Sequence, residues 1–296
     1  MRVICIGECM VELRAAEGEG LQRGFAGDVY NTAVYLKREL PEAEVALLTV
    51  TGVDPLSTAM RASWREEGLQ EDLAFTVPDR LPGLYLVQTD AVGERRFFYW
   101  RGESAARGWL AALERQGGKA LLEGALVYLS GISLAILPAG ERPAALRLLG
   151  SIGVPLAFDP NYRASLWENV RAARDVCESM MGLAKFVLPS LDDLDALWGV
   201  QSPDEHLARL TALGAGEVAL TLGAQGCLLA DRRIDCPPGR GVIDTSGAGD
   251  AFNGAYLAAR LRGRSPQEAA RTGLSLSRRV VAYRGALIPR VPMELC

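Results

Sequence analysis

The segment of residues 241–254 contains the residue types that an enzyme needs to bind a phosphate group and to remove a proton. Its sequence is GVIDTSGAGDAFNG. Residues 241–243 predict the end of a strand, and apolar residues at helical spacing from Phe252 to Ala259 predict that a helix follows. The first N–H groups of a helix lack partners within it and lie at its positive end. Because Gly247 and Gly249 also let a ligand approach the backbone, the segment predicts an anion site.

Asp250 stands in the predicted first turn of this helix, where a carboxylate has two interpretations. An acidic residue there is an ordinary preference of helix N-termini. Beside an anion site, the same carboxylate could take the proton of a hydroxyl group as that group attacks a phosphoryl group. The single histidine, His206, is expected in an exposed first turn of another helix with no nucleophile nearby. A general base in this chain is therefore expected to be a carboxylate.

The composition is that of an ordinary globular protein with a large core. The chain has 296 residues, of which 49% are hydrophobic and 23% are charged. A net charge of −4 gives no reason to expect nucleic acid or an anionic membrane as a partner. The apolar start before Glu8 is too short for a secretion signal, and no apolar run is long enough to span a bilayer. The six cysteines form no CxxC pair, which favours buried thiols and a cytoplasmic location.

Strands and helices are predicted to alternate along most of the chain. Strands are expected at 3–7, 10–13, 45–50, 125–130, 154–159, 186–190, 217–223 and 226–230, and helices at 29–36, 55–68, 107–123, 140–152, 191–198 and from 265 to about 283. This order predicts an α/β fold with a mainly parallel sheet. Two β-rich runs, 84–89 and 95–100, predict a hairpin with its turn at 90–94, outside the main sheet. No linker divides the chain, so we expect a single domain over residues 1–296.

Residues 244–252 resemble the signature of the PfkB family of ribokinase-like sugar kinases, Asp-Thr-x-Gly-Ala-Gly-Asp-x-Phe, at every fixed position. The resemblance implies a three-layer α/β/α fold and an ATP-dependent phosphotransferase with an alcohol group as acceptor. It implies a β lid from strands within residues 9–26 and 83–102, through which two copies could form a homodimer or a larger oligomer. It further implies that Asp250 is the catalytic base and that the amides of Gly247, Ala248 and Gly249 hold the transferred phosphoryl group.

A second glycine turn that leads into a helix lies at residues 25–36. Asp28 could simply cap this helix. In the PfkB family, however, the matching Gly-Gly-Asp-x-x-Asn segment binds sugar hydroxyls, and here Ala26 replaces the first glycine. The resemblance therefore implies that Gly27, Asp28 and Asn31 contact the sugar.

The loop at residues 221–226 contains two glycines, and the resemblance makes it the nucleotide loop. The residues that it implies at ATP are Asn161, Ser190, Thr221, Gly223, Gly226 and Gly249. A Gly-x-x-x-x-Gly-Lys-Ser/Thr loop is missing, so a P-loop mechanism is not supported. The family positions Mg²⁺ through water with an Asn-x-x-Glu motif. Here the motif is altered at both ends, to Ser190-Leu191-Asp192-Asp193, and Asp193 is the remaining residue for the metal.

Two arginines follow predicted strand ends: Arg101 after Tyr-Trp, and Arg163 after Asp-Pro-Asn-Tyr. An arginine in such a place is often a surface group, but two that converge on one crevice would bind a carboxylate or a phosphate. The branch of the family that phosphorylates 2-keto-3-deoxygluconate carries both motifs. The resemblance to this branch extends from residue 4 to about residue 290. It implies a sugar-acid site made of Gly27, Asp28, Tyr85, Tyr99, Arg101, Arg163 and Asp250.

Two other functions remain open at this point. A fructokinase, or another kinase for neutral sugars, would use the same scaffold without needing the two arginines. A sugar or nucleotide sensor without catalysis would also keep the fold, and the altered motif at Ser190–Asp193 leaves room for it. The intact Gly-Ala-Gly-Asp sequence at 247–250 argues against the sensor.

Overall fold

A computed structural model describes residues 1–15, 20–89, 95–239 and 241–290. Its centre is a seven-stranded sheet with the strand order β11-β10-β9-β8-β1-β4-β5, and each neighbouring pair is parallel. The strands are β1 (Arg2–Ile6), β4 (Glu44–Thr51), β5 (Ala74–Thr76), β8 (Ala125–Ser130), β9 (Leu156–Asp159), β10 (Phe186–Val187) and β11 (Glu217–Val218). The predicted parallel α/β fold is therefore confirmed.

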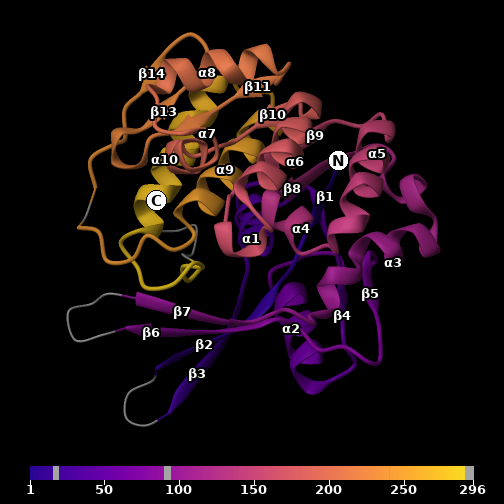
Figure 1. The fold of residues 1–296 in the computed structure, drawn as a ribbon. Coiled ribbons are helices and arrows are strands. Elements are labelled where there is room, and N and C mark those ends of the chain that lie inside the picture. The colour runs from indigo at the N-terminus through magenta and orange to yellow at the C-terminus, as the bar shows by residue number, and fades with distance from the viewer. Residues whose placement is uncertain (16–19, 90–94, 240, 291–296) are drawn as a thin grey trace.

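Helices cover both faces of this sheet (Figure 1). Their bounds are α1 (Asp28–Glu39), α2 (Pro55–Glu66), α3 (Trp109–Gln116), α4 (Gly131–Ala135), α5 (Arg142–Ser151), α6 (Val170–Leu183), α7 (Leu191–Trp198), α8 (Pro203–Ala212), α9 (Ala248–Leu261) and α10 (Pro266–Val280). Alternate residues of β1 point into different cores, because side chains of a strand alternate between its two faces. Val3 and Cys5 pack in the core under α1 and α9, and Ile4 and Ile6 pack in the core under α3 and α6. This arrangement is a three-layer α/β/α fold.

A separate four-stranded sheet, called the lid sheet below, has the order β3-β2-β6-β7. Its strands are β2 (Met10–Ala15), β3 (Leu21–Ala26), β6 (Leu84–Thr89) and β7 (Arg95–Trp100). In Figure 1 they lie together at the lower edge of the view, outside the main body. Both predicted lid ranges thus contribute strands to one sheet. The predicted turn at 90–94 lies outside the described residues.

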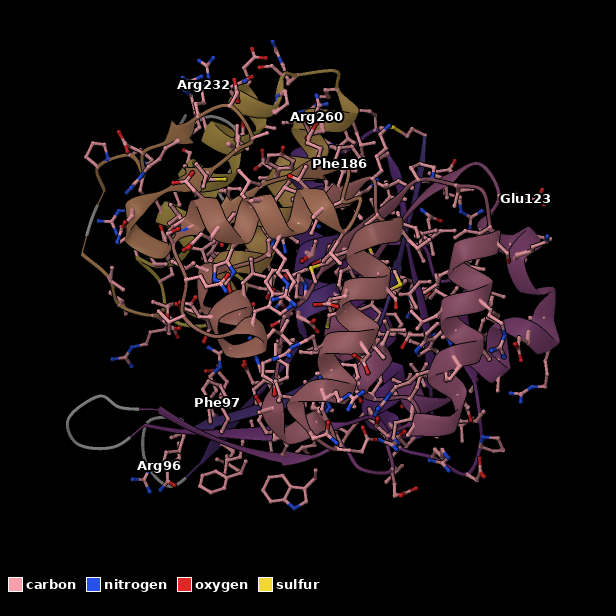
Figure 2. All side chains as sticks on the ribbon, turned by 45° about the horizontal axis from the view of Figure 1, so that its top comes forward. Arg96, Phe97, Glu123, Phe186, Arg232 and Arg260 are labelled. Carbon is pink, nitrogen blue, oxygen red and sulfur yellow. The ribbon has the colours of Figure 1, made fainter. Side chains whose placement is uncertain are left out.

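The strands of the lid sheet alternate between a face toward the body and a face away from it. Figure 2 shows Arg96 and Phe97 on opposite sides of β7. Tyr99 pairs with Tyr85 across the strands on the side of Phe97, and Phe98 pairs with Leu86 on the other side.

The sequence predictions were wrong for one helix and for two strands. The helix expected over 107–123 is divided at Gly117, whose φ of 135° ends α3 before a 3₁₀ turn. The strand expected over 217–223 is also divided. Its first part is β11, and its second part, β12 (Leu220–Thr221), joins a small sheet with β13 (Cys227–Leu228) and β14 (Arg233–Ile234).

Residues 241–243 do not end a strand as expected. They have no strand partner among the described residues, and Val242 and Ile243 are exposed. The segment is instead fixed by the amides of Ile243 and Asp244, which both donate to the carbonyl of Val281 just after α10. The backbone of this segment is therefore attached to a helix end and not to a sheet, and the side chains of Val242 and Ile243 stay exposed.

The prediction that His206 is exposed was wrong as well. Its side chain is fully buried, its Nε2 lies 2.7 Å from Oδ1 of Asp195, and its ring packs against Trp198. Ser202 and Glu205 form a capping box that fixes the start of α8. His206 lies four residues before the buried Leu210, on the inner face of the helix.

No helix in the described part of the chain is long and apolar enough to cross a membrane. The cysteines described are free thiols, and four of them, Cys5, Cys9, Cys177 and Cys227, are buried.

Candidate active site

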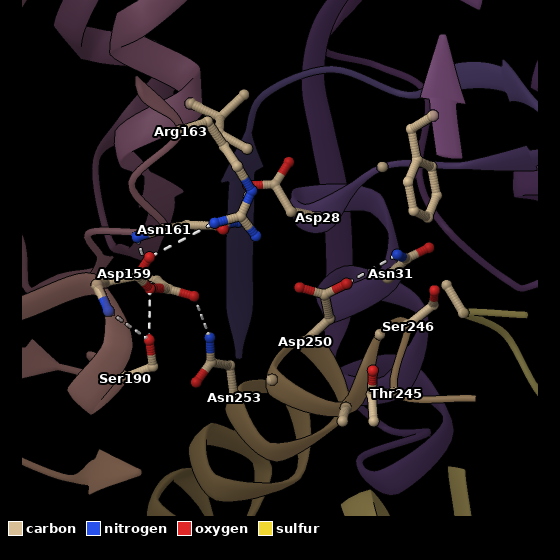
Figure 3. A pocket seen from close by; sticks show the side chains of 18 of the residues that line it. Asp28, Asn31, Asp159, Asn161, Arg163, Ser190, Thr245, Ser246, Asp250 and Asn253 are labelled. Carbon is tan, nitrogen blue, oxygen red and sulfur yellow. Dashed lines mark hydrogen bonds and ion pairs between the residues drawn. The ribbon is translucent and has the colours of Figure 1, made fainter. Parts of the chain in front are cut away.

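A pocket of about 570 Å³ lies between the carboxyl ends of the central strands, the N-terminus of α9 and the lid sheet. Figure 3 shows its side chains converging from segments that are far apart in the sequence. The residues that the sequence predicted for the site and that line this pocket are Gly27, Asp28, Asn31, Tyr85, Tyr99, Arg101, Asn161, Arg163, Ser190, Asp193, Thr221, Gly247, Ala248, Gly249 and Asp250. Ligands of open α/β sheets bind at this edge.

The N-terminus of α9 faces the pocket with uncommitted backbone amides. Gly247 is the N-cap residue with φ of 72°, and a Cβ there would lie 2.6 Å from the carbonyl oxygen of Ala286, so only glycine fits. A Cβ on Gly249 would meet no atom within 4 Å, because that side of the turn opens into the pocket. The amides of Gly249 and Asp250 have no acceptor within the described chain, whereas the Ala248 amide donates to Thr245 at 3.3 Å. This geometry suits a phosphate group.

Asp250 projects from the first turn of α9 into the same pocket. Its Oδ2 accepts a hydrogen bond from Nδ2 of Asn31 at 2.8 Å (Figure 3). Burial is the main cause that raises the pKa of Asp250 to about 7, and the negative charge of Asp28 raises the pKa further. The hydrogen bond from Asn31 and the charge of Arg163 both lower the pKa. A carboxyl group with a pKa near neutrality can accept and release a proton at physiological pH.

Asp28 does not cap α1, because Gly27 is the N-cap residue and has no side chain to cap with. Asp28 is instead the first residue of the helix, and its Oδ2 accepts a hydrogen bond from Nδ2 of Asn161 at 2.8 Å. A Cβ on Gly27 would lie 2.4 Å from the carbonyl oxygen of Glu8, so the helix start packs tightly against the chain after β1. The glycine thus allows Asp28 to reach the pocket.

Asn161 has a φ of 33°, the one positive value among the described residues that are not glycine. Asparagine tolerates this conformation better than most residues do. Residues in such strained backbone conformations cluster at functional sites. The backbone amide of Asn161 donates to Oδ1 of Asp159 at 3.0 Å, while its side chain holds Asp28. The strained turn therefore joins the end of β9 to the start of α1.

The two arginines of the site have different surroundings. The side chain of Arg101 is 10% exposed and pairs with Glu8, which is almost fully buried. The side chain of Arg163 is 53% exposed and lies 3.4 Å from Oδ1 of Asp193. Both line the pocket, and both charges lower the pKa of Tyr99, which burial raises. The sequence-based expectation that they converge on one crevice agrees with these positions.

Four aspartates line the pocket beside the two arginines: Asp28, Asp159, Asp193 and Asp250. Burial raises the pKa of Asp159, and the charge of Asp193 raises it further. Burial also raises the pKa of Asp193, although Ser190 donates a hydrogen bond to its Oδ2 at 2.7 Å. Carboxylate oxygens are the ligands that Mg²⁺ prefers, and a cation beside Asp159 and Asp193 would relieve their repulsion.

The carboxylates of the pocket thus fit Mg²⁺, but only as one or two of its ligands. The described residues contain no group of three or more His, Cys, Asp or Glu side chains arranged to hold a metal ion. Mg²⁺ is often bound by one or two carboxylates together with phosphate oxygens and water. The pocket fits that mode.

Two predicted nucleotide residues, Gly223 and Gly226, are not among the residues that line the pocket, although Thr221 at the base of their loop is. Gly226 has a structural reason to be glycine. Its φ is 107°, and a Cβ would lie 2.0 Å from the carbonyl oxygen of Ile234 in the neighbouring strand.

Sequence reasoning missed several residues that line the pocket, above all Asp159 and Asn253. Nδ2 of Asn253 donates to Oδ2 of Asp159 at 2.7 Å, so these two residues connect α9 with β9 (Figure 3). Asn253 lies three residues after Asp250, on the same face of the helix, and this spacing could have found it. Asp159 is the last residue of a buried strand at the carboxyl edge, which was also a usable signal.

A helix terminus with open amides, an adjacent carboxylate and a lid over a polar pocket are the features expected of a ribokinase-like sugar kinase. The chain belongs to the pfkB family of carbohydrate kinases, whose sequence pattern matches residues 1–292.

Two characterised relatives are named 2-dehydro-3-deoxygluconokinase. The protein of Dickeya dadantii (strain 3937) is 41% identical over 97% of this chain and 96% of its own length. The protein of Escherichia coli (strain K12) is 40% identical over 99% of this chain and 98% of its own length. Among solved structures, a PfkB protein from Polaromonas sp. JS666 is similar with a TM-score of 0.83 and 26% identity, over 96% of each chain.

Proposed function

We propose that this protein transfers the γ-phosphoryl group of ATP to the terminal hydroxyl of 2-keto-3-deoxy-D-gluconate, the sugar acid that the relatives' names call 2-dehydro-3-deoxygluconate. The product is the 6-phosphate. The identity of 40–41% over nearly the whole length to two enzymes with that name supports the substrate. The observation that carries the proposal is that Asp250, the open amides of α9 and two arginines line one pocket.

The chemical step needs a base beside an anion site. The terminal hydroxyl oxygen attacks the γ-phosphorus, the bond from that phosphorus to the bridging oxygen breaks, and ADP leaves. Asp250 takes the hydroxyl proton, and Asn31 holds the accepting carboxylate in place. The open amides of Gly249 and Asp250 stabilise the charge of the transferred group, as preorganised N–H donors do.

The substrate is held by groups of both the body and the lid sheet. Arg101 and Arg163 bind its carboxylate, and Asp28, Asn31, Tyr85 and Tyr99 bind its hydroxyls. Gly27, which lines the pocket, contacts the sugar through its backbone. The lid sheet excludes water, which would otherwise compete with the sugar for the phosphoryl group.

ATP lies toward the end of the pocket that carries Thr221. The residues that we assign to it are Asn161, Ser190, Thr221, Gly223, Gly226 and Gly249. Asp193 would hold Mg²⁺ through water, and the bound ion would supply charge neutralisation on the phosphate oxygens. The raised pKa values of Asp159 and Asp193 support a cation at this place.

We further propose a cytoplasmic homodimer that forms through the outer face of the lid sheet. Phe98 and Trp100 are 42% and 61% exposed, and they lie on the face of β7 that points away from the pocket. Large exposed apolar side chains on an edge strand support a protein partner, and a second copy is the partner that symmetry favours.

The test is ADP release with a panel of acceptors: 2-keto-3-deoxygluconate, gluconate, fructose and ribose. We expect turnover of the sugar acid, and we expect Arg163→Ala to weaken the sugar acid selectively. Preference for fructose would replace the proposed substrate with a neutral sugar. Absence of turnover with every acceptor would favour a sensor.

A further inference from the structure

Glu8 is a buried acid that does not itself line the pocket. It follows β1 and precedes β2, and 2% of the residue is exposed. Its Oε2 accepts a hydrogen bond from Nη2 of Arg101, and the two side chains form an ion pair. A buried acid of this kind is costly unless its partner is fixed.

The pair leaves one part of the Arg101 guanidinium available. Nη2 is held by Glu8, and Nε is buried without a partner in the described chain. Nη1 therefore remains as the donor for a ligand, because Arg101 lines the pocket. Oε1 of Glu8 is also buried and has no partner in the described chain. The contact is thus made by one donor and one acceptor, and it determines the direction of the guanidinium.

Glu8 is enclosed by two glycines, Gly27 of the pocket and Gly83 just before β6. A Cβ on Gly83 would lie 2.5 Å from Oε1 of Glu8 and 3.2 Å from Cβ of Arg101. A Cβ on Gly27 would lie 2.4 Å from the backbone oxygen of Glu8. Glu8 thus lies between the entry to β6, the end of β7 and the start of α1. A residue in this place connects the lid sheet with the helix that carries Asp28 and Asn31.

We propose that Glu8 is a positioning residue for the sugar acid, because its carboxylate directs the guanidinium of Arg101 so that Nη1 meets the substrate carboxylate. The inference rests on the proposed function. Glu8 acts through Arg101 and touches no substrate atom. Its negative charge has a second role: it balances the buried arginine while the site is empty, so the arginine can stay in place without a bound anion.

The test is a double-mutant cycle with Glu8→Gln, Arg101→Ala and both together, measured by steady-state kinetics with ATP saturating. Glutamine keeps the size of the side chain and removes the charge. We expect Glu8→Gln to raise the KM for the sugar acid at least about tenfold, with kcat and the KM for ATP within about twofold. In the Arg101→Ala background, Glu8→Gln should have no further effect on this KM, because the residue acts through Arg101.

A matched control is Glu217→Gln. Glu217, in β11, also holds an arginine through both carboxylate oxygens: its partner is Arg260, in the last turn of α9, and neither residue lines the pocket. This control should lower the thermal midpoint without changing the KM for the sugar acid. A second variant, Gly83→Ala, keeps Glu8 and displaces its carboxylate. It should raise the same KM, and it covers the case in which Glu8→Gln does not fold.

The outcomes separate the two proposals. A wild-type enzyme that does not turn over the sugar acid overturns the proposed function. If the wild type is active, an unchanged KM in both Glu8→Gln and Gly83→Ala overturns the positioning role. An equal rise in KM for the sugar acid and for ATP, or a Glu8→Gln effect that persists without Arg101, shows a merely structural role and also overturns it.

Discussion

The ionisation of Asp250 should determine how the rate depends on pH. A pKa of about 7 means that about 9% of the enzyme carries the ionised base at about pH 6, and about 91% at about pH 8. If Asp250 must be ionised to accept the proton, kcat/KM for the sugar should rise about tenfold between these two values. An aspartate at the ordinary value of 3.8 would be ionised throughout this range and would give a flat profile.

Two neighbours should move this profile in opposite directions. Asn31→Ala removes the hydrogen bond that lowers the pKa of Asp250, so the midpoint should move to higher pH. Asp28→Asn removes the charge that raises the pKa, so the midpoint should move to lower pH. Asparagine at position 28 can still accept the hydrogen bond from Asn161.

The assay is kcat/KM for the sugar acid over about pH 5.5 to 8.5, with ATP kept saturating at each pH so that changes in ATP affinity do not shape the profile. Both variants should also lower the rate, since they change the sugar site, and therefore the midpoint and not the amplitude carries the information. A flat wild-type profile, or midpoints that move in the same direction in both variants, would refute the assignment of Asp250 as the titrating base.

Three further predictions concern stability and assembly. The folded state binds the Asp250 proton more tightly than the unfolded state, so the stability of the protein falls as the pH rises from 3.8 to about 7. Asp250→Asn should therefore raise the thermal midpoint at about pH 8 more than at about pH 5. An equal change at both pH values would contradict this prediction. Gly254→Ala places a Cβ 2.8 Å from the backbone of α1, so it should cost about 1–3 kcal/mol in urea unfolding and lower kcat, and wild-type stability would be the contrary result. Trp100→Glu should halve the mass by light scattering if the lid sheet forms the dimer, and an unchanged mass would place the interface elsewhere.

Much of the fold could be predicted because the signals were local. Hydrophobic runs gave the central strands, and the predicted start of the last helix at residue 265 agrees with the capping box of Ser265 and Glu268. The errors arose where a contact with a distant part of the chain determined the local structure. Ile243 has the side chain of a strand residue, but its amide is bound by Val281, 38 residues further along the chain.

Most of the predicted site residues line one pocket, but the contacts that connect them could not be predicted. The signature segment supplied Asp250, and a resemblance supplied Asp28 and Asn161. That Asn161 would hold Asp28, or that Asn31 would hold Asp250, depends on pairs separated by 133 and 219 residues. No local pattern contains such information. The role of Glu8 could not be predicted for the same reason, because its partner Arg101 lies 93 residues away in the sequence.

The lid sheet has a consequence for attempts to redesign specificity. Its strands come in two pairs that interrupt the body, β2 and β3 between β1 and α1, and β6 and β7 between β5 and α3. The pairs meet where β2 runs parallel to β6, from Val11–Leu84 to Arg14–Val87. A chimera that takes only residues 83–102 from a relative would have to pair its new β6 with the unchanged β2. Residues 83–102 alone therefore cannot carry the acceptor preference from one protein to another, and both pairs of strands must be exchanged together.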